Sequence, residues 1–504
     1  MVWSNTLSYL TTFNNIHHLD FLAGYEIDDT YNDYLSGEAY NFTTPDKHAI
    51  SNGMKTVSVG GSDSRYRLVS YLSRLNYDYK NKYYLGASFR VDGSSRLHRD
   101  NRWGTFWSVS GAWRTIEEEF MQPVKDWLTD LRIRASYGVN GTLPSDYFGY
   151  MGLSSISGGY LEQPGIQMSQ IANPNLKWET NYNMNIGLDF GFWDRLNFTI
   201  EYYTRTTKNL LMDCPVSMTT GFSSYLMNIG EVKNKGIELT INSTNIKIKD
   251  FSWNTTFNLG HNSNKVVKLD GEQTQIVSGT QIHKVGSSYR TFYVQEFAGI
   301  NPETGNPLFY TNELDENGNY IKEITENSKN AQFIPYKHAE PTVNGGISNS
   351  LRYKWLDLNF LFSYQFGGYS YDTWAQKTEH GGYDSYANIP TYYRDSWKKP
   401  GDQTNIEVYM PGKSSSVSMH KITSSRRIHS TDYFRLKNIT FGITLPKEWT
   451  NKINIGNVRF YASASNLWTW AAYDNYDPEA VSAGSATQTT PPLKTVTFGL
   501  NINF

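Results

Sequence analysis

Apolar and polar residues alternate along most of this chain. From Tyr182 to Phe192 every even position is apolar, and every odd position is Asn, Gly or Asp. Because successive side chains of a strand point to opposite faces, such a stretch has one apolar face and one polar face. The same alternation returns at residues 356–366 and at the end of the chain, from Val496 to Phe504. The pattern predicts an all-β protein.

About fifteen segments carry this signal, and most are ~9–14 residues long, the length that a tilted membrane-spanning strand needs. We predict strands at 1–12, 17–29, 65–79, 82–92, 105–115, 130–138, 178–192, 195–205, 235–248, 250–262, 342–353, 355–367, 432–445, 456–466 and 493–504. The one helical stretch that the sequence suggests is short and lies around Glu117–Trp127.

The connections between these segments alternate between short and long. Short turns are expected at 80–81, 193–194, 249–250 and 353–354. Long polar loops are expected near 30–64, 139–177, 206–234, 263–341, 368–431 and 467–492. Outer-membrane barrels have this arrangement, with short periplasmic turns and long extracellular loops. A series of soluble β-sandwiches is the alternative, but it requires linkers between domains, and no Pro/Gly/Ser-rich linker separates regions of different composition.

We therefore predict a transmembrane antiparallel β-barrel and treat residues 1–504 as one barrel domain. The composition agrees with this prediction. Charged residues make up 19% of the chain and aromatic residues 15%, and no apolar run is long enough for a membrane helix. The formal net charge of -2 argues against nucleic acid as a partner. Cys214, the single cysteine, excludes an intrachain disulfide and a cysteine-based metal site.

Several segments resemble the SusC/RagA-type TonB-linked outer-membrane transporters, which are TonB-dependent receptors. The resemblance is carried, in the order found in that family, by Arg74–Tyr79 with Tyr83–Leu85, Phe89–Arg96, Asn101–Gly104, Ala112–Arg114, Leu131–Gly138, Asn173–Glu179, Asn234–Glu238, Ser465–Trp470 and Tyr476–Glu479. Each segment alone is a weak signal, but the combination spans most of the chain and is specific.

The resemblance implies a barrel of about twenty-two strands around a plug domain. It also implies location in the Gram-negative outer membrane and import of a glycan or peptide. The implied partners are outer-membrane lipid, the barrel-assembly machinery, a SusD-like surface lipoprotein, the TonB complex through the plug region, and an oligosaccharide or peptide substrate. The plug domain is absent from this sequence, so we expect the carboxy-terminal part of a barrel, with unpaired edges at residues 1–12 and 493–504. A passive or purely structural barrel remnant is the alternative, and an outer-membrane barrel enzyme is a weaker one.

Catalytic and metal-binding signals are weak. No zinc-protease, phosphate-loop or serine-hydrolase motif is present, so we predict no enzyme activity, catalytic residue, cofactor or metal site. His17 and His18 are adjacent in a predicted strand and should point to opposite faces. The loop Asp315–Asn319 is similar to a calcium loop, but its glycine is misplaced and no bidentate Glu follows, so a solvated turn accounts for it better.

The loop that follows residue 367 carries the strongest ligand-binding signal. Its aromatic residues are Tyr369, Tyr371, Trp374, Tyr383, Tyr386, Tyr392, Tyr393 and Trp397. Aromatic rings among carboxylates and amides suit sugars and peptides, which stack on the rings and accept directed hydrogen bonds. The same rings would equally serve to pack the loop on itself or on a partner. At the chain end, the aromatic Phe504 is predicted to be part of a barrel assembly signal.

Overall fold

The computed structural model describes residues 1–44, 46, 49–160, 163–269, 274–383, 388–412, 419, 421–450, 452, 455–486 and 489–503. Within them, fifteen strands form one large sheet in which sequence order and spatial order are the same. These strands are β1 (Val2–Phe13), β2 (His17–Phe42), β3 (Gly53–Tyr79), β4 (Tyr83–Ser94), β5 (Trp103–Trp113), β6 (Leu128–Thr142), β9 (Glu179–Phe192), β10 (Leu196–Lys208), β13 (Glu231–Ile248), β14 (Phe251–Lys268), β22 (Val343–Tyr353), β23 (Leu356–Phe366), β26 (Tyr433–Thr444), β27 (Asn457–Ala471) and β30 (Thr495–Asn503).

All fifteen predicted segments are confirmed as strands of this sheet. The order begins at β1, whose described neighbour is β2, and ends at β30, whose described neighbour is β27. Among the described residues, every helix is too short or too polar to cross a bilayer. Phe504 lies outside the described residues, so its part in assembly stays a prediction.

The chain divides into two compact units. The first consists of Met1–Glu117, Arg134–Asn185 and Arg205–Glu231, and the second of Glu118–Ile133, Ile186–Thr204 and Val232–Phe504.

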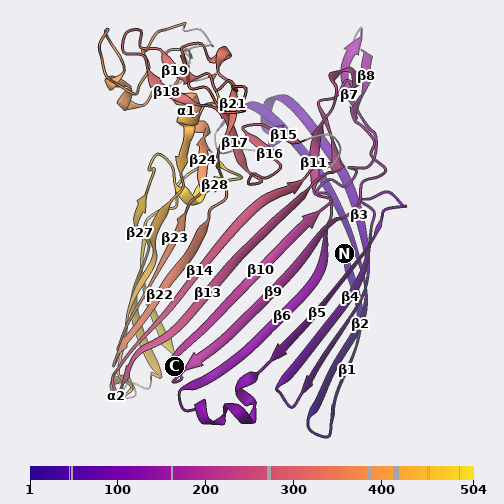
Figure 1. Cartoon of the computed structure of the whole chain (residues 1–504), viewed down its shortest axis with the longest axis vertical. Coiled ribbons are helices and arrows are strands. Elements are labelled where there is room, and N and C mark those ends of the chain that lie inside the picture. Colours follow the sequence, from indigo (N-terminus) through magenta and orange to yellow (C-terminus); the bar gives the residue numbers. More distant parts are fainter. Residues whose placement is uncertain are drawn as a thin grey trace. The chain divides into compact units, whose positions relative to one another are not determined.

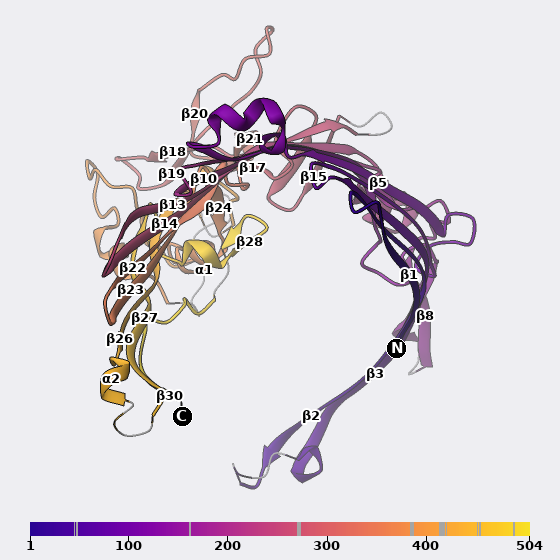
Figure 2. The same ribbon diagram turned by 90° about the horizontal axis from the view of Figure 1, so that it is seen from below.

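In the first unit, β2 and β3 pair from His17–Tyr79 up to Phe42–Gly53, with one register shift. The prediction of a loop over 30–64 is therefore wrong for most of that range, because both strands continue as a two-stranded arm. Figure 2 shows this arm leaving the other strands of the unit. The unit also contains two short hairpins, β7 (Leu153–Tyr160) with β8 (Gln163–Gln170) and β11 (Leu211–Pro215) with β12 (Ser224–Asn228).

In the second unit, the connections predicted as loops contain small sheets. One is built from β15 (Gln275–Ser278), β16 (Gln281–Lys284), β17 (Thr291–Gln295) and β21 (Phe333–His338), and another from β18 (Phe297–Ile300), β19 (Pro307–Tyr310) and β20 (Ile324–Thr325). A third joins β24 (Tyr369–Asp372), β25 (Ile428–Ser430), β28 (Val481–Ser482) and β29 (Ser485–Ala486). Figure 1 shows the first two sheets beyond the upper ends of β22 and β23. The long polar loop predicted near 263–341 therefore contains strands of its own, which the sequence pattern did not predict.

The connections opposite the long loops are of two kinds. The turns near 80, 193, 249 and 354 are short, as predicted, but residues 114–127 and 445–456 form longer connections. The first contains two 3-10 helices, Thr115–Glu117 and Glu119–Val124, where a short helix was expected, and the second contains α2 (Lys447–Thr450). At the turn after β3, Lys80 and Asn81 both have positive φ, and the Lys82 N–H donates to the Tyr79 carbonyl at 3.0 Å.

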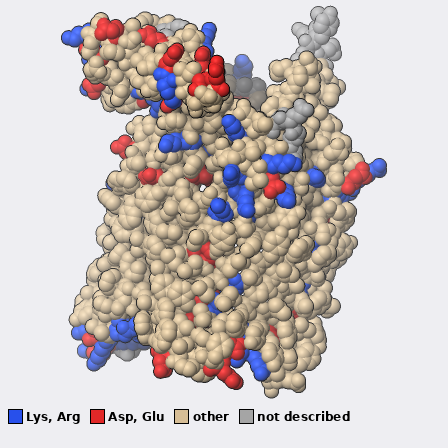
Figure 3. All heavy atoms as spheres, in the orientation of Figure 1, with Lys and Arg blue, Asp and Glu red and all other residues tan. Residues whose placement is uncertain are grey.

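The two faces of the strands have the polarity that the alternation predicts. On β9 the apolar Ile186 and Leu188 are 43% and 37% exposed, whereas Asn181 on the other face is fully buried. Asn181 accepts hydrogen bonds from Arg205 and Thr207 on β10. An apolar face that is exposed beside a polar face that is hydrogen-bonded is the arrangement of a membrane β-barrel wall. Figure 3 shows Lys, Arg, Asp and Glu mainly toward the two ends of the strands, with few between.

Candidate ligand-binding site

The loop assembly of the second unit, defined as residues 369–383, 388–412 and 421–431, holds most of the predicted aromatic residues. Tyr371 and Tyr393 are only 1% and 5% exposed, and Tyr371 packs against Phe292 and Val294. Burial raises the pKa of Tyr371 to about 12, so its phenol stays neutral at physiological pH. These two rings therefore lie in the interior of the assembly.

The other predicted rings occupy several environments. Tyr392 donates a hydrogen bond to Glu379, and the Trp397 indole donates to the Pro302 carbonyl at 2.7 Å. Lysine ammonium groups lie over the rings of Tyr369 and Tyr383, at 5.3 and 5.2 Å from the ring centres. Tyr386 lies outside the described residues.

Trp374, another of the predicted aromatic residues, lines a cavity. It lies in α1 (Thr373–Thr378), is 41% exposed, and helps to enclose a volume of about 670 Å³. Asp372 begins this helix, and one of its carboxylate oxygens accepts the Ala375 N–H at 2.8 Å. Trp374 is therefore presented by a capped helical turn. Figure 2 shows α1 and β28 on the same side of strands β22, β23, β26 and β27.

The rest of the cavity wall comes from segments far away in sequence. Trp470 on β27 and Tyr476 supply two further rings, and Asp474 and Asn475 supply exposed polar groups. Burial raises the pKa of Tyr476 to about 12, so its phenol stays neutral. Composition alone was a usable signal for these residues, because Tyr473–Asp477 has the same mixture of aromatic and acidic side chains as the loop after residue 367. Sequence reasoning did not connect the two segments.

A buried ionic cluster holds one wall of this cavity against the large sheet. The Arg435 side chain on β26 is 3% exposed and forms an ion pair with Asp477 at 2.6 Å and another with Glu479. Lys437 also binds Glu479, at 2.7 Å. Because all of these charges are paired, they fix the segment after β27 without leaving a buried charge uncompensated.

A second cluster lies inside the loop assembly. Arg427 is 1% exposed and forms an ion pair with Glu379, whose carboxylate also lies 3.5 Å from Arg426. Burial lowers the pKa of Arg427 to about 10, so the guanidinium stays charged at neutral pH. The neighbouring His429 ring stacks on Tyr473 with ring centres 3.7 Å apart, and burial lowers its pKa to about 4.

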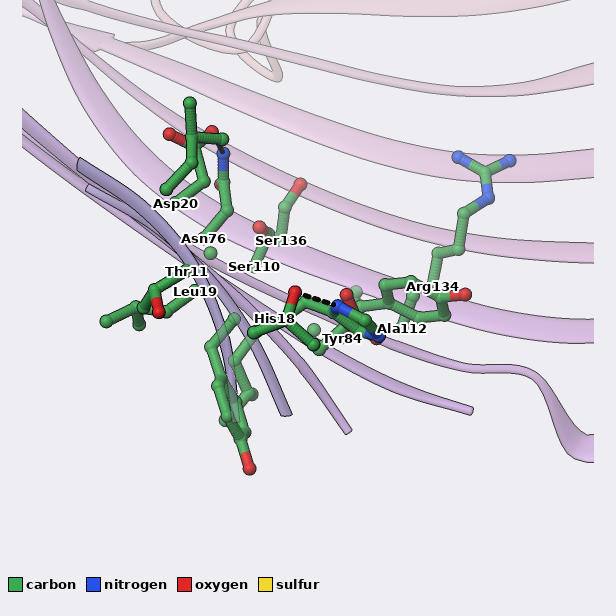
Figure 4. A pocket seen from close by; sticks show the side chains of 18 of the residues that line it. Thr11, His18, Leu19, Asp20, Asn76, Tyr84, Ser110, Ala112, Arg134 and Ser136 are labelled. Atoms are coloured by element: carbon green, nitrogen blue, oxygen red, sulfur yellow. Dashed lines mark hydrogen bonds between the residues drawn. The ribbon is translucent and has the colours of Figure 1, made fainter. Parts of the chain in front are cut away.

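A separate cavity of about 870 Å³ lies on the polar face of the first unit, close to the turn ends of β1 to β6. Figure 4 shows the Thr11–Leu19 strand pair, Asp20, Asn76 and Arg134 around it. The Asn76 amide donates to Asp20 at 3.2 Å, and Arg74 lies 3.1 Å from the same carboxylate. Asp20, Asn76 and Arg134 give this wall charged and amide groups beside its apolar residues, which suits water or a polar protein segment.

Metal binding has no support in these sites. Over the part of the chain that the structure describes, no three His, Cys, Asp or Glu side chains come together as a metal site would require. His17 forms a hydrogen bond with Tyr77, and His18 forms one with Thr12, so the two rings have different partners. Asp315 accepts the N–H groups of Asn317 and Asn319 at 2.9 and 2.8 Å, which makes its loop a self-contained turn.

Together, the two-faced strands and the loops at one end of them define a membrane β-barrel protein. The family described as TonB dependent receptor-like, beta-barrel matches residues 2–312. This chain therefore belongs to the TonB-dependent receptor-like β-barrel family.

Individual relatives agree with this assignment. TonB-dependent receptor P3 of Formosa agariphila is 32% identical over 99% of this chain and 52% of its own length. TonB-dependent receptor SusC of Bacteroides thetaiotaomicron is 30% identical over 94% of this chain and 47% of its own. A chain of the RagAB peptide transporter superposes with a TM-score of 0.87 and 27% identity over all of this chain and 55% of that one. The chain thus spans about half the length of the relatives that it matches.

Proposed function

We propose that this chain supplies barrel wall and outer loops to an outer-membrane importer of oligosaccharides or oligopeptides. In this proposal the chain works with a SusD-like surface lipoprotein and is energised by the TonB complex through a plug region, and it carries out no catalysis. The family is one of TonB-dependent receptors, and the relatives include SusC and the RagAB peptide transporter.

One observation carries the proposal, namely the loop cavity that Trp374, Trp470 and Tyr476 line beside Asp474 and Asn475. Its volume of about 670 Å³ is within the range of sites that enclose a small ligand. Flat rings next to carboxylate and amide groups bind sugar rings or peptide side chains by stacking and directed hydrogen bonds. The buried ion pairs around Arg435 hold this wall in place before ligand arrives.

Ligand retention by the purified protein tests the proposal. The protein, expressed in full from its gene, is incubated with a size-fractionated oligosaccharide mixture or a tryptic oligopeptide mixture, and bound molecules are identified by mass spectrometry. We expect one mixture to be retained and Trp374→Ala to weaken retention about tenfold, because a stacking ring is lost. The matched control is Tyr383→Ala, which removes an aromatic ring of similar exposure from outside the cavity. Equal losses in the two variants, or retention of neither mixture, would refute the proposal.

A further inference from the structure

Two rows of aromatic side chains cross the exposed face of the first unit. The row nearer the turns consists of one directly opposed residue from each of β2, β3, β4 and β5, in that order: His17, Tyr79, Tyr83 and Trp113. The centres of neighbouring rings in this row are 4.9, 6.3 and 6.5 Å apart. The second row has ring centres 5.9, 5.1 and 6.3 Å apart and consists of Trp3, Tyr25, Tyr71 and Trp103. Aromatic rows of this kind mark the two interfaces of a bilayer.

The face between the rows is free of charge on strands β2 to β5, all of which the structure describes there. It consists of Leu19, Phe21, Ala23, Ser73, Leu75, Tyr77, Leu85, Ala87, Phe89, Val91, Thr105, Trp107, Val109 and Gly111. Its large side chains are open to the surroundings, with Leu85 61% and Phe89 50% exposed. Strand β5 runs from one row to the other in 11 residues, which matches the ~9–11 residues of a tilted membrane crossing. The rows therefore bound the hydrocarbon band.

The first charged residues beyond the second row, on the same face, are arginines gathered around one carboxylate. Arg65 Nε donates to Asp29 at 2.7 Å, and Arg67 binds the same carboxylate at 2.5 Å. Both guanidinium groups remain accessible, with side-chain exposures of 59% and 54%. Two cations sharing one anion leave a positive charge, and the accessible N–H groups can bind a further acceptor.

Arg102 adds a third cation to this cluster. Together with Arg65, Arg67 and Trp103 it lines a cavity of about 460 Å³. Its Nε is buried and has no hydrogen-bond partner among the described residues. The guanidinium charge is delocalised over all three nitrogens, so Arg102 adds positive charge to the cavity although Nε itself is shielded. The three arginines and Asp29 carry a formal charge of about +2, which selects an anion.

We propose that Arg65, Arg67 and Arg102 form a site for the phosphate group of an anionic glycolipid in the outer leaflet. The inference rests on the outer-membrane location in the proposed function. Guanidinium groups bind phosphate through paired, charge-assisted hydrogen bonds. The site lies immediately outside the aromatic row, at the depth of lipid headgroups, and Trp103 belongs both to that row and to the cavity wall. A headgroup bound there keeps its acyl chains against the uncharged band.

Lipid retention tests this site. The protein, expressed in full from its gene, is placed in nanodiscs doped with a phosphorylated glycolipid or with the same glycolipid after enzymatic dephosphorylation, and retained lipid is counted by native mass spectrometry. We expect retention of the phosphorylated form alone, and at least tenfold less of it in the double variant Arg65→Gln and Arg67→Gln. The matched control is Arg74→Gln, which removes an arginine from the opposite face of the same strand.

Arg65→Lys with Arg67→Lys keeps both charges, and we expect it to retain more lipid than the glutamine pair while folding normally on a heat-modifiability gel. The proposal is overturned by equal retention of the two lipids, by unchanged binding in the glutamine pair, by an equal loss in Arg74→Gln, or by displacement of the lipid by an equimolar amount of inorganic phosphate. Because no import is measured, failure here leaves the proposed transport function untouched, and failure of ligand retention leaves this site untouched.

Discussion

The exposed face of β2 to β5 and the loop assembly of the second unit place their side chains in opposite ways. On the strands, Leu85 and Phe89 are exposed while polar residues line the other face. In the loop assembly, Glu379 and Arg427 are buried while Trp374 is exposed. The first arrangement is stable when the surroundings are apolar, and the second when every buried charge has a partner. Stability in the two regions therefore depends on different terms, and substitutions can separate them.

The largest effect is expected at the buried ion pair of the loop assembly. Arg427→Met should cost about 3–5 kcal/mol of local stability, because it leaves the Glu379 carboxylate buried without its main partner. Hydrogen exchange of the amides in residues 369–412 measures this loss. Adding Glu379→Gln to the same chain should recover part of it, since the buried carboxylate charge is removed, although Arg426 then loses the same partner.

The matched surface variant is Arg99→Met, which removes one partner of the exposed Arg99–Asp100 pair and should change stability by less than about 1 kcal/mol. If the amides of residues 369–412 exchanged no faster in Arg427→Met than in Arg99→Met, the buried pair would not be what stabilises the assembly.

A smaller effect is expected on the exposed face of the strands. Arg at Leu188 should cost about 2–4 kcal/mol in a bilayer, because the charge must enter the hydrocarbon region. Arg at Asn185, on the polar face of the same strand, should cost far less. The folded fraction against urea concentration, in lipid vesicles, measures both. Equal destabilisation would mean that the apolar stripe is buried in a protein core instead of facing lipid.

The same comparison explains what the sequence could predict. The fifteen strands follow from alternation, because a face that meets lipid and a face that meets water impose a period of two on each strand. The alternation did not predict the far ends of β2 and β3, because the arm beyond Asp29 and Arg65 leaves the apolar band and no longer needs that strict pattern. The short strands of the loops have no period at all. Tyr371 in β24, for example, pairs in parallel with Ser485.

The candidate site was predictable only in part for the same reason. Composition drew attention to the aromatic loop, but it does not separate the buried Tyr371 and Tyr393 from Trp374 in the cavity wall. Tertiary contacts decide which of these rings is buried and which lines the cavity. They also bring Trp470 and Tyr476 to the same cavity as Trp374. Ligand contact by the loop aromatics therefore stays a prediction, and Trp374 is the residue on which to test it.

The smallest of the expected effects is a pH dependence confined to the loop assembly. His429 stacks on Tyr473, and burial lowers its pKa from the ordinary 6.5 to about 4, although the nearby Asp372 carboxylate opposes this shift and Arg426 and Arg427 add to it. The unfolded loop therefore binds a proton near pH 6.5 that the folded loop excludes. Stability from this residue is complete above that pH and is lost as the pH falls toward 4.

Between pH 7.5 and 5 the loop assembly should lose about 2 kcal/mol, as measured by protease cleavage rates or hydrogen exchange of residues 421–431. His429→Gln removes the titrating group and should abolish most of this loss, whereas the strands, with their exposed apolar face, should show none of it over the same range. An identical loss in the wild-type chain and in His429→Gln would show that some other group senses the pH.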